Sequence, residues 1–250
     1  MVSFASEKVF SLGSIPITNT VLNTLVVDVA LIAGALFLTK RLNQIPSLMQ
    51  NAIEALIETF YNLTQTVAPN RAAKIFPYLA TFFLFILISN WSGLIPGVGS
   101  IGFFHNGQLI PILRSTTSDL NTTLGLALVS AVATHLLSLR IIGIKEYFGR
   151  YFSLNPVNLY VGLLEIISEI TKVISLSFRL FGNIFAGEVV LITISGIFAF
   201  IFPVPFLLLE FIVGFVQALV FAMLTMAFMA ILSTPHHQTA KEVNHKEYES

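Results

Sequence analysis

Apolar segments about as long as a membrane is thick alternate with short polar segments along this chain. Residues 21–39, 75–95 and 119–139 are mainly apolar, and each is close to the roughly 20 helical residues that cross the ~30 Å hydrocarbon core of a bilayer. The segment 75–95 carries no charge, and Trp91 lies near its end, where aromatic side chains collect at the membrane interface. We predict that these segments are membrane-spanning helices.

The pattern changes in residues 46–67, where apolar and polar residues occupy opposite sides of a helix. At 100° per residue, Ile53 and Phe60 fall on the apolar side, whereas Asn51 and Glu58 fall on the polar side. A helix of this kind lies on a surface instead of crossing the bilayer. We therefore predict an amphipathic surface helix over this segment.

After Pro156 no proline interrupts the segment 156–202, which as one helix would be roughly twice as long as a membrane is thick. Only 14 apolar residues lie between Glu188 and Pro203, so the segment cannot be divided into two upright spans. We predict one long, steeply tilted helix, a turn at Pro203 and Pro205, and a returning tilted helix over 206–232.

Composition favours an all-α integral membrane protein with a single domain over residues 1–250, about five membrane-embedded helices and one amphipathic surface helix. Hydrophobic residues make up 55% of the chain, charged residues make up 10%, and the mean hydropathy is +0.85. The formal net charge is zero and basic residues occur singly or in pairs, so no nucleic acid partner is indicated. Cysteine is absent, which excludes a thiolate metal site.

Basic residues near the span ends are unevenly distributed between the two sides of the membrane. One side has pairs such as Lys40 and Arg41, whereas the other has only Lys8 and Arg114. By the positive-inside rule, the N-terminus, residues 1–20, is external, and the tail, residues 233–250, is cytoplasmic. The expected location is a bacterial plasma membrane, with an organellar energy-transducing membrane as the alternative.

The long predicted helix carries an arginine, Arg179, among apolar neighbours such as Phe178 and Leu180. A charge at membrane depth costs from roughly 3 to more than 10 kcal/mol, and such charges mark ion pathways. Glu165 lies about 21 Å from Arg179 toward the cytoplasm, and Glu188 lies about 13 Å from it toward the exterior. A snorkelling arginine is disfavoured because Arg179 is far from both helix ends.

These positions suggest two proton-accessible half-paths that do not meet, separated by the fixed charge of Arg179. Asn183 shares the polar stripe of Arg179, and on the returning helix Glu210 and Gln217 share a face because they are seven residues apart. Glu210 lies near the external turn and can approach Glu188. The arginine can ionise a carboxylate that is brought beside it, and this movable carboxylate has to come from a partner.

Other polar residues are candidates for lining these paths: Asp119, Asn121, His135, Lys172 and Ser175. Asp119 and Asn121 also fit a helix cap. His135 could line the outer path, but a hydrogen-bonded packing role is favoured. Lys172 fits a salt bridge or an interface anchor, and Ser175 fits simple helix packing. A further acidic residue of this helix, Glu169, is interpreted as interfacial.

The run SLSFRLFGNIFAGE, with Glu165 in NPVNLYVGLLE and Gln217 in GFVQALVFAML, resembles subunit a of F-type ATP synthases, the stator half of their membrane motor. PSLMQNAIEALIETF, NWSGLIP and DLNTTLGLAL resemble further segments of that family. The resemblance implies that Arg179 is the family's essential arginine. It places Asn183, Glu188, Glu210 and Gln217 in the outer half-channel or beside the arginine, and Glu165 in the inner half-channel. Some members have histidine at the position of Glu210.

The resemblance also implies partners: a ring of c subunits that supplies the carboxylate, the b stalk, the rest of the ATP synthase and the lipid bilayer. No cofactor or metal is expected. H⁺ and Na⁺ both stay open as the coupling ion, because the binding carboxylate belongs to the ring. A secondary ion transporter or channel is the alternative, but the chain shows no internal repeat. The enzyme motifs HExxH and GxSxG and a Gly-rich phosphate loop are absent, so the chain is expected to be non-catalytic.

Overall fold

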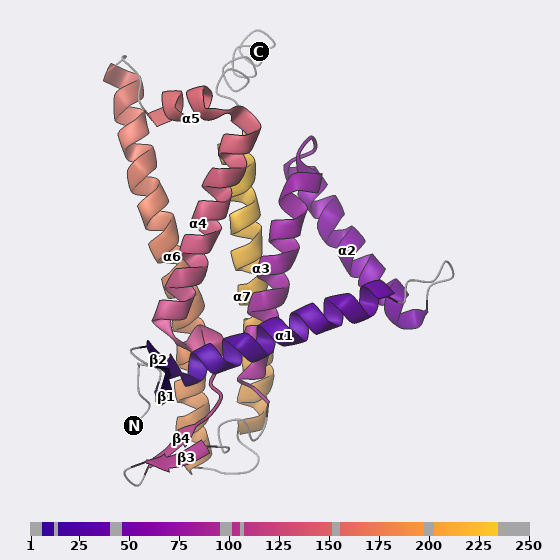
Figure 1. The fold of residues 1–250 in the computed structure, drawn as a ribbon, viewed down its shortest axis with the longest axis vertical. Coiled ribbons are helices and arrows are strands. Elements are labelled where there is room, and N and C mark those ends of the chain that lie inside the picture. The colour runs from indigo at the N-terminus through magenta and orange to yellow at the C-terminus, as the bar shows by residue number, and fades with distance from the viewer. Residues whose placement is uncertain are drawn as a thin grey trace.

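The structure, a computed structural model, describes residues 7–12, 15–40, 47–95, 102–105, 108–151, 156–197 and 203–234. Its elements follow in this order: β1 (Lys8–Leu12), β2 (Ile15–Thr18), α1 (Asn19–Lys40), α2 (Leu48–Val67), α3 (Ala72–Ser92), β3 (Gly102–His105), β4 (Gln108–Pro111), the short 3₁₀ helix η2 (Thr116–Ser118), α4 (Leu120–Ile142), α5 (Ile144–Tyr151), α6 (Pro156–Ile197) and α7 (Pro203–Leu232). Both β pairs are antiparallel hairpins. In Figure 1 the β3–β4 hairpin lies at the lower end of the bundle, the β1–β2 hairpin lies above it at the start of α1, and α5 lies at the upper end.

The predicted all-α membrane class is confirmed. Among the described residues, four helices are long and apolar enough to cross a membrane, namely α1, α3, α4 and α7. Helix α6 is 42 residues long and carries several charges, which separates it from these four. In Figure 1 it runs the length of the bundle beside α4, and α7 returns from the lower end. The β hairpins and α5 were not predicted from the apolar pattern.

The core forms where α3 packs against α7, with α4 and α6 alongside. Ile75, Leu79 and Ile86 of α3 are fully buried. At the lower end, the Trp91 ring stacks on Phe211 with ring centroids 4.1 Å apart, and its indole N–H donates to the Phe211 carbonyl at 3.1 Å. These contacts set the rotation of α7 about its axis and its position along α3. They therefore determine which side chains α7 presents to α6.

The prolines expected to form the turn before the last helix lie inside that helix instead. Helix α7 begins at Pro203, so Pro203 and Pro205 both occupy its first turn. The first N–H groups of a helix have no acceptor within the helix, so proline is tolerated there. The helix therefore starts three residues earlier than the predicted 206–232.

A buried polar layer crosses the bundle at residues 115–119. The Thr117 hydroxyl donates to the Asn90 side-chain oxygen of α3 at 2.6 Å, and the Asn23 amide of α1 donates to the Thr116 hydroxyl at 3.0 Å. On the other side, Thr123 of α4 and Ser177 of α6 share a hydroxyl hydrogen bond at 3.2 Å. Every residue from 115 to 119 is buried. The layer ties four helices together through groups that would be costly to leave unpaired.

Candidate functional site

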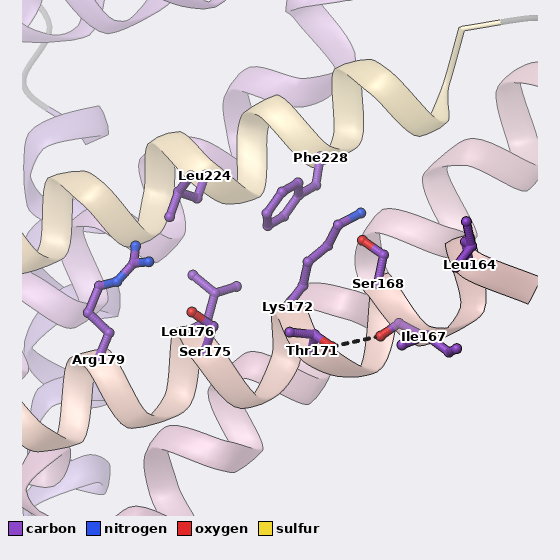
Figure 2. A pocket seen from close by; sticks show the side chains of 10 residues that line it. All are labelled: Leu164, Ile167, Ser168, Thr171, Lys172, Ser175, Leu176, Arg179, Leu224 and Phe228. Atoms are coloured by element: carbon purple, nitrogen blue, oxygen red, sulfur yellow. Dashed lines mark hydrogen bonds between the residues drawn. The ribbon is translucent and has the colours of Figure 1, made fainter. Parts of the chain in front are cut away.

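Helix α6 holds Arg179 beside a groove that it forms with α7. The groove has a volume of about 430 Å³, and both basic residues of α6 line it, Lys172 and Arg179. Leu224 and Phe228 line it from α7. Figure 2 shows the two basic side chains pointing toward α7 from positions two turns apart, with Ser175 on the turn between them. The groove is therefore mainly apolar, with positive charge along one side.

Arg179 is exposed within an apolar surface. Phe178 next to it is 56% exposed, and Ile174 and Ile170, one and two turns earlier, are also exposed. Within the part of the chain that the structure describes, Arg179 makes no ion pair or hydrogen bond. Asn183, one turn later, is exposed as well. This face of α6 therefore presents a guanidinium that no described carboxylate neutralises.

Toward the β hairpins, α6 carries a second charged site, which pairs Glu188 with Arg114. The Arg114 Nε lies 3.1 Å from Glu188 Oε1, and its Nη2 lies 3.1 Å from Oε2, so the pair is bidentate. The side chain of Arg114 is 9% exposed, and that of Glu188 is 27% exposed. The sequence placed Arg114 on the external side but gave no sign of this pairing.

Glu210 of α7 approaches this pair, as the sequence predicts. Its residue is only 7% exposed, and its carboxyl group lies directly over Gly187, at the position where any larger residue would place a Cβ atom. Its Oε1 is buried and has no hydrogen-bond partner within the described residues. The charges of Glu210 and Glu188 are close enough to interact. Two acidic groups and one arginine therefore meet between α6, α7 and the segment after β4.

Gln217 is half-buried on α7, two turns beyond Glu210. Within the described part of the chain, no hydrogen bond joins it to Arg179 or to Glu210. The structure thus brings Glu188 and Glu210 together, and it leaves Asn183 and Gln217 on the neighbouring turns of α6 and α7.

At the other end of α6, Glu169 is the centre of a charged network. Lys172 Nζ lies 2.7 Å from Glu169 Oε1, and His135 Nε2 of α4 lies 3.8 Å from Oε2. His135 Nδ1 also shares a hydrogen bond of 2.7 Å with the Tyr147 hydroxyl of α5. Of the two roles considered for Lys172, the structure shows the salt bridge. His135 has the hydrogen-bonded packing role that the sequence favoured, and it lies with Glu169 and Tyr147 instead of beside Glu188.

The ion pairs of Glu169 join α4 to α6. Glu165, one turn earlier, is half-buried. Tyr151 of α5 lies near both carboxylates, and burial raises the pKa of its hydroxyl, with smaller contributions from Tyr147 and from the charges of Glu165 and Glu169. Helix α5 therefore places a buried tyrosine beside Glu165 and Glu169.

Asp119 is the N-cap of α4, and Asn121 supplies the backbone N–H that is capped. The Asp119 carboxylate accepts the backbone N–H of Asn121 at 2.9 Å, and it also accepts the Thr20 hydroxyl at 3.2 Å. Asp119 is 5% exposed, whereas Asn121 is exposed. Within the described residues, no group of three or more histidine, aspartate or glutamate side chains is arranged to hold a metal ion. The adjacent His236 and His237 lie outside the described residues.

The comparisons with known proteins agree on one family. The family model for the ATP synthase A chain matches residues 21–230. The ATP synthase subunit a of Moorella thermoacetica is 33% identical over 223 residues, which cover 89% of this chain and 94% of the relative. ATP synthase subunit a 2 of Pelobacter propionicus is 34% identical over 90% of this chain and 91% of the relative. The Legionella pneumophila subunit a is 33% identical over 91% of both.

These matches span the groove, the Arg114–Glu188 pair and the Glu169 network, and they accompany four helices of membrane-spanning length and composition. The chain is therefore a multi-pass membrane protein that belongs to the ATP synthase A chain family.

Proposed function

We propose that this chain is the proton-translocating stator of the membrane sector of an F-type ATP synthase. It provides two offset half-paths that load and unload the carboxylates of a rotating c-subunit ring, and this couples ion flow to rotation. The chain itself carries out no nucleotide chemistry, which takes place in other subunits. The b-subunit stalk holds the chain in place, and the chain lies in a bacterial plasma membrane with its C-terminus in the cytoplasm.

The exposed guanidinium of Arg179 is the observation that supports this proposal most directly. A charged group facing lipid tails would cost at least roughly 3 kcal/mol. Arg179 faces outward, and the nearby exposed side chains, such as Phe178, are apolar. An apolar partner surface that carries a carboxylate would remove that cost, because it supplies both the apolar contact and the opposite charge.

The strength of that pairing decides which charge state the ring carboxylate adopts. At 4 Å and an effective dielectric constant near 20, two opposite charges attract by about 4 kcal/mol, which corresponds to about three pH units of titration. A ring carboxylate that is protonated in the membrane therefore releases its proton when it reaches Arg179. An arginine does not deprotonate under these conditions, so the barrier between the two half-paths stays charged.

The two clusters on α6 lie on either side of this barrier. Glu188 and Glu210 form the outer half-path on the side of the β hairpins, and Glu165 forms the inner half-path on the side of α5. Asn183 and Gln217 lie on the turns between Arg179 and the outer cluster. Lys172 and Ser175 line the groove between Arg179 and the inner cluster.

Substitution of Arg179 tests the proposal in the whole complex. Arg179→Lys keeps the charge but loses the planar set of five donors, and a desolvated lysine can lose its proton, so we expect little or no ATP synthesis. Arg179→Gln should abolish synthesis and let protons leak through the ring. Leakage is measured as potential-driven proton flux in vesicles from which the catalytic head has been removed.

Arg140→Gln is the matched control, because Arg140 is an exposed arginine in the last turn of α4. It should leave synthesis and leakage at the parental level. Coupled synthesis near the parental rate in Arg179→Gln would refute the stator role. Normal impermeability of Arg179→Gln vesicles would refute the barrier role alone.

A further inference from the structure

The outer cluster, as defined here, consists of Arg114, Glu188 and Glu210, so it contains one cation and two carboxyl groups. Arg114 comes from the extended segment after β4, Glu188 from α6 and Glu210 from α7. Each of these groups is at least largely withdrawn from water. Because isolated charge is costly in a medium of low dielectric constant, a cluster like this favours the state in which its charges sum to zero. With Arg114 charged, that state holds a single proton.

The geometry decides which carboxyl group stays ionised. Both oxygens of Glu188 receive N–H groups of Arg114, at 3.1 Å each, and charge-assisted bidentate pairs are among the strongest in proteins. A proton on Glu188 would displace one of these bonds. Glu210 has no such partner in the described structure, and its Oε1 makes no hydrogen bond there. The proton of the cluster therefore resides on the Glu210 side.

We propose that Arg114 is a positioning residue of the outer half-path: it holds Glu188 as a fixed carboxylate beside Glu210, so that the cluster passes one proton at a time. This inference rests on the proposed stator function. It assigns a role to a residue in the extended segment before α4, and it separates the roles of the two acidic residues. Glu188 holds the site in place, and Glu210 exchanges the proton.

The elements η2 and α4 also pack against α6, and the acidic residue where they join, Asp119, accepts hydrogen bonds from the Thr20 hydroxyl and the backbone N–H of Asn121. Arg114 faces Glu188 from the segment after β4, and Glu210 faces it from α7. The charged residues nearest along α6 in the described chain are Arg179, about 13 Å away, and Lys172 still further along. Arg114 is the cation that the described structure pairs with Glu188.

Removal of the Arg114 charge tests this directly. Arg114→Gln removes the one cation and leaves two carboxyl groups, so the three-residue cluster should bind a second proton, and the external pH that gives half-maximal proton flux should move upward by about 1 to 3 units. The partial exposure of Glu188 favours the lower end of this range. Flux is measured in vesicles that contain the whole membrane sector while the pH of the external compartment is varied.

Three further variants separate the charge of Arg114 from its shape and from simple structural damage. Arg114→Lys keeps the charge and loses the bidentate contact, so the half-maximal pH should stay near the parental value while the rate falls. Arg114→Gln combined with Glu188→Gln removes both charges, leaves Glu210 alone and should return the half-maximal pH toward the parental value. Arg140→Gln removes a distant arginine charge and should change neither quantity.

A half-maximal pH that is the same in Arg114→Gln and in Arg140→Gln would overturn the proposal. If Arg114→Gln assembles but conducts too little to measure, Arg114→Lys and the double variant decide. A parental half-maximal pH in both of these variants supports the inference, and an upward shift in Arg114→Lys overturns it. Absence of proton flux in the parental complex would instead refute the stator function, so the two failures are distinguishable.

Discussion

Replacing Gly187 by alanine puts a methyl group where the carboxyl group of Glu210 lies. The added Cβ would overlap the carboxyl oxygens and carbon of Glu210, and no rotation of a methyl group relieves that overlap. Ordinary contact between heavy atoms is about 3.5 to 4 Å, so the carboxyl group has to move by at least about 1 Å. The atoms that have to move are the far end of a flexible side chain, so the backbone can stay in place.

The expected effects on stability and on conduction therefore differ. Overpacking a buried site costs about 1 to 3 kcal/mol, and glycine to alanine within a helix returns up to about 1 kcal/mol, so the complex should assemble in near-parental amounts. Proton transfer, however, needs heavy atoms about 2.6 to 3.2 Å apart, and a displacement of about 1 Å can cost up to about 100-fold in rate. We expect proton flux to fall at least about tenfold.

The assay is passive proton flux, driven by an imposed potential, in vesicles stripped of the catalytic head. Gly196→Ala is the matched control, because Gly196 lies on the same helix and a Cβ there meets nothing within 4 Å. Shortening the acidic side chain, as in Gly187→Ala with Glu210→Asp, makes room for the methyl group and should restore part of the flux. Parental flux in Gly187→Ala would refute the placement of Glu210 against α6, and so would a double variant no better than the single one.

Three other outcomes are expected. Glu188→Gln and Glu210→Gln should each slow proton uptake from the external side, and their combination should cost less than the sum, since both act in one cluster; fully additive losses would place them in separate paths. Glu165→Cys, in a chain that has no other cysteine, should react with a membrane-impermeant thiol reagent from the cytoplasmic side only, and labelling from the exterior would contradict the orientation. Tyr151 lies outside the candidate spans, and burial raises the pKa of its hydroxyl above the ordinary 10.0, so the unfolded state ionises first and stability should fall as the pH rises above 10. Tyr151→Phe should lose less stability than the parent over that alkaline range in thermal unfolding of the purified complex, and equal losses would contradict the burial argument.

Helical periodicity and chain direction were enough to predict the approach of Glu210 to Glu188. Both residues lie on long apolar helices, and a hairpin of two helices leaves little freedom in how positions near its turn face each other. The same reasoning identified Arg179 as the central charge, because a cation among apolar residues is visible in the sequence itself. The exposure of Arg179 on an open face of the chain required the structure, since periodicity does not say which neighbour covers a helix face.

The pairing of Arg114 with Glu188 could not be predicted, because Arg114 lies in an extended segment that has no repeating sequence pattern. The only signal in the sequence was that Arg114 is one of the few basic residues on the predicted external side. The structure shows the hydrogen-bonded role that the sequence favoured for His135, but its partners could not be predicted. One of them, Tyr147, belongs to α5, a helix of eight residues that is too polar and too short to stand out as a span. Contacts that depend on such connecting segments are set by tertiary packing.

The buried polar layer at residues 115–119 constrains the order in which the chain can be built into a membrane. Its hydroxyl and amide groups bond to Asn23 of α1 and Asn90 of α3, and both of these helices leave the ribosome before the layer does. Backbone that is not α-helical is tolerated at membrane depth only where protein surrounds it. Helices α1 and α3 therefore form the surface to which this segment binds during synthesis. The bond from Thr123 to Ser177 forms later, so α6 is added after α1, α3 and α4, onto a surface already in place.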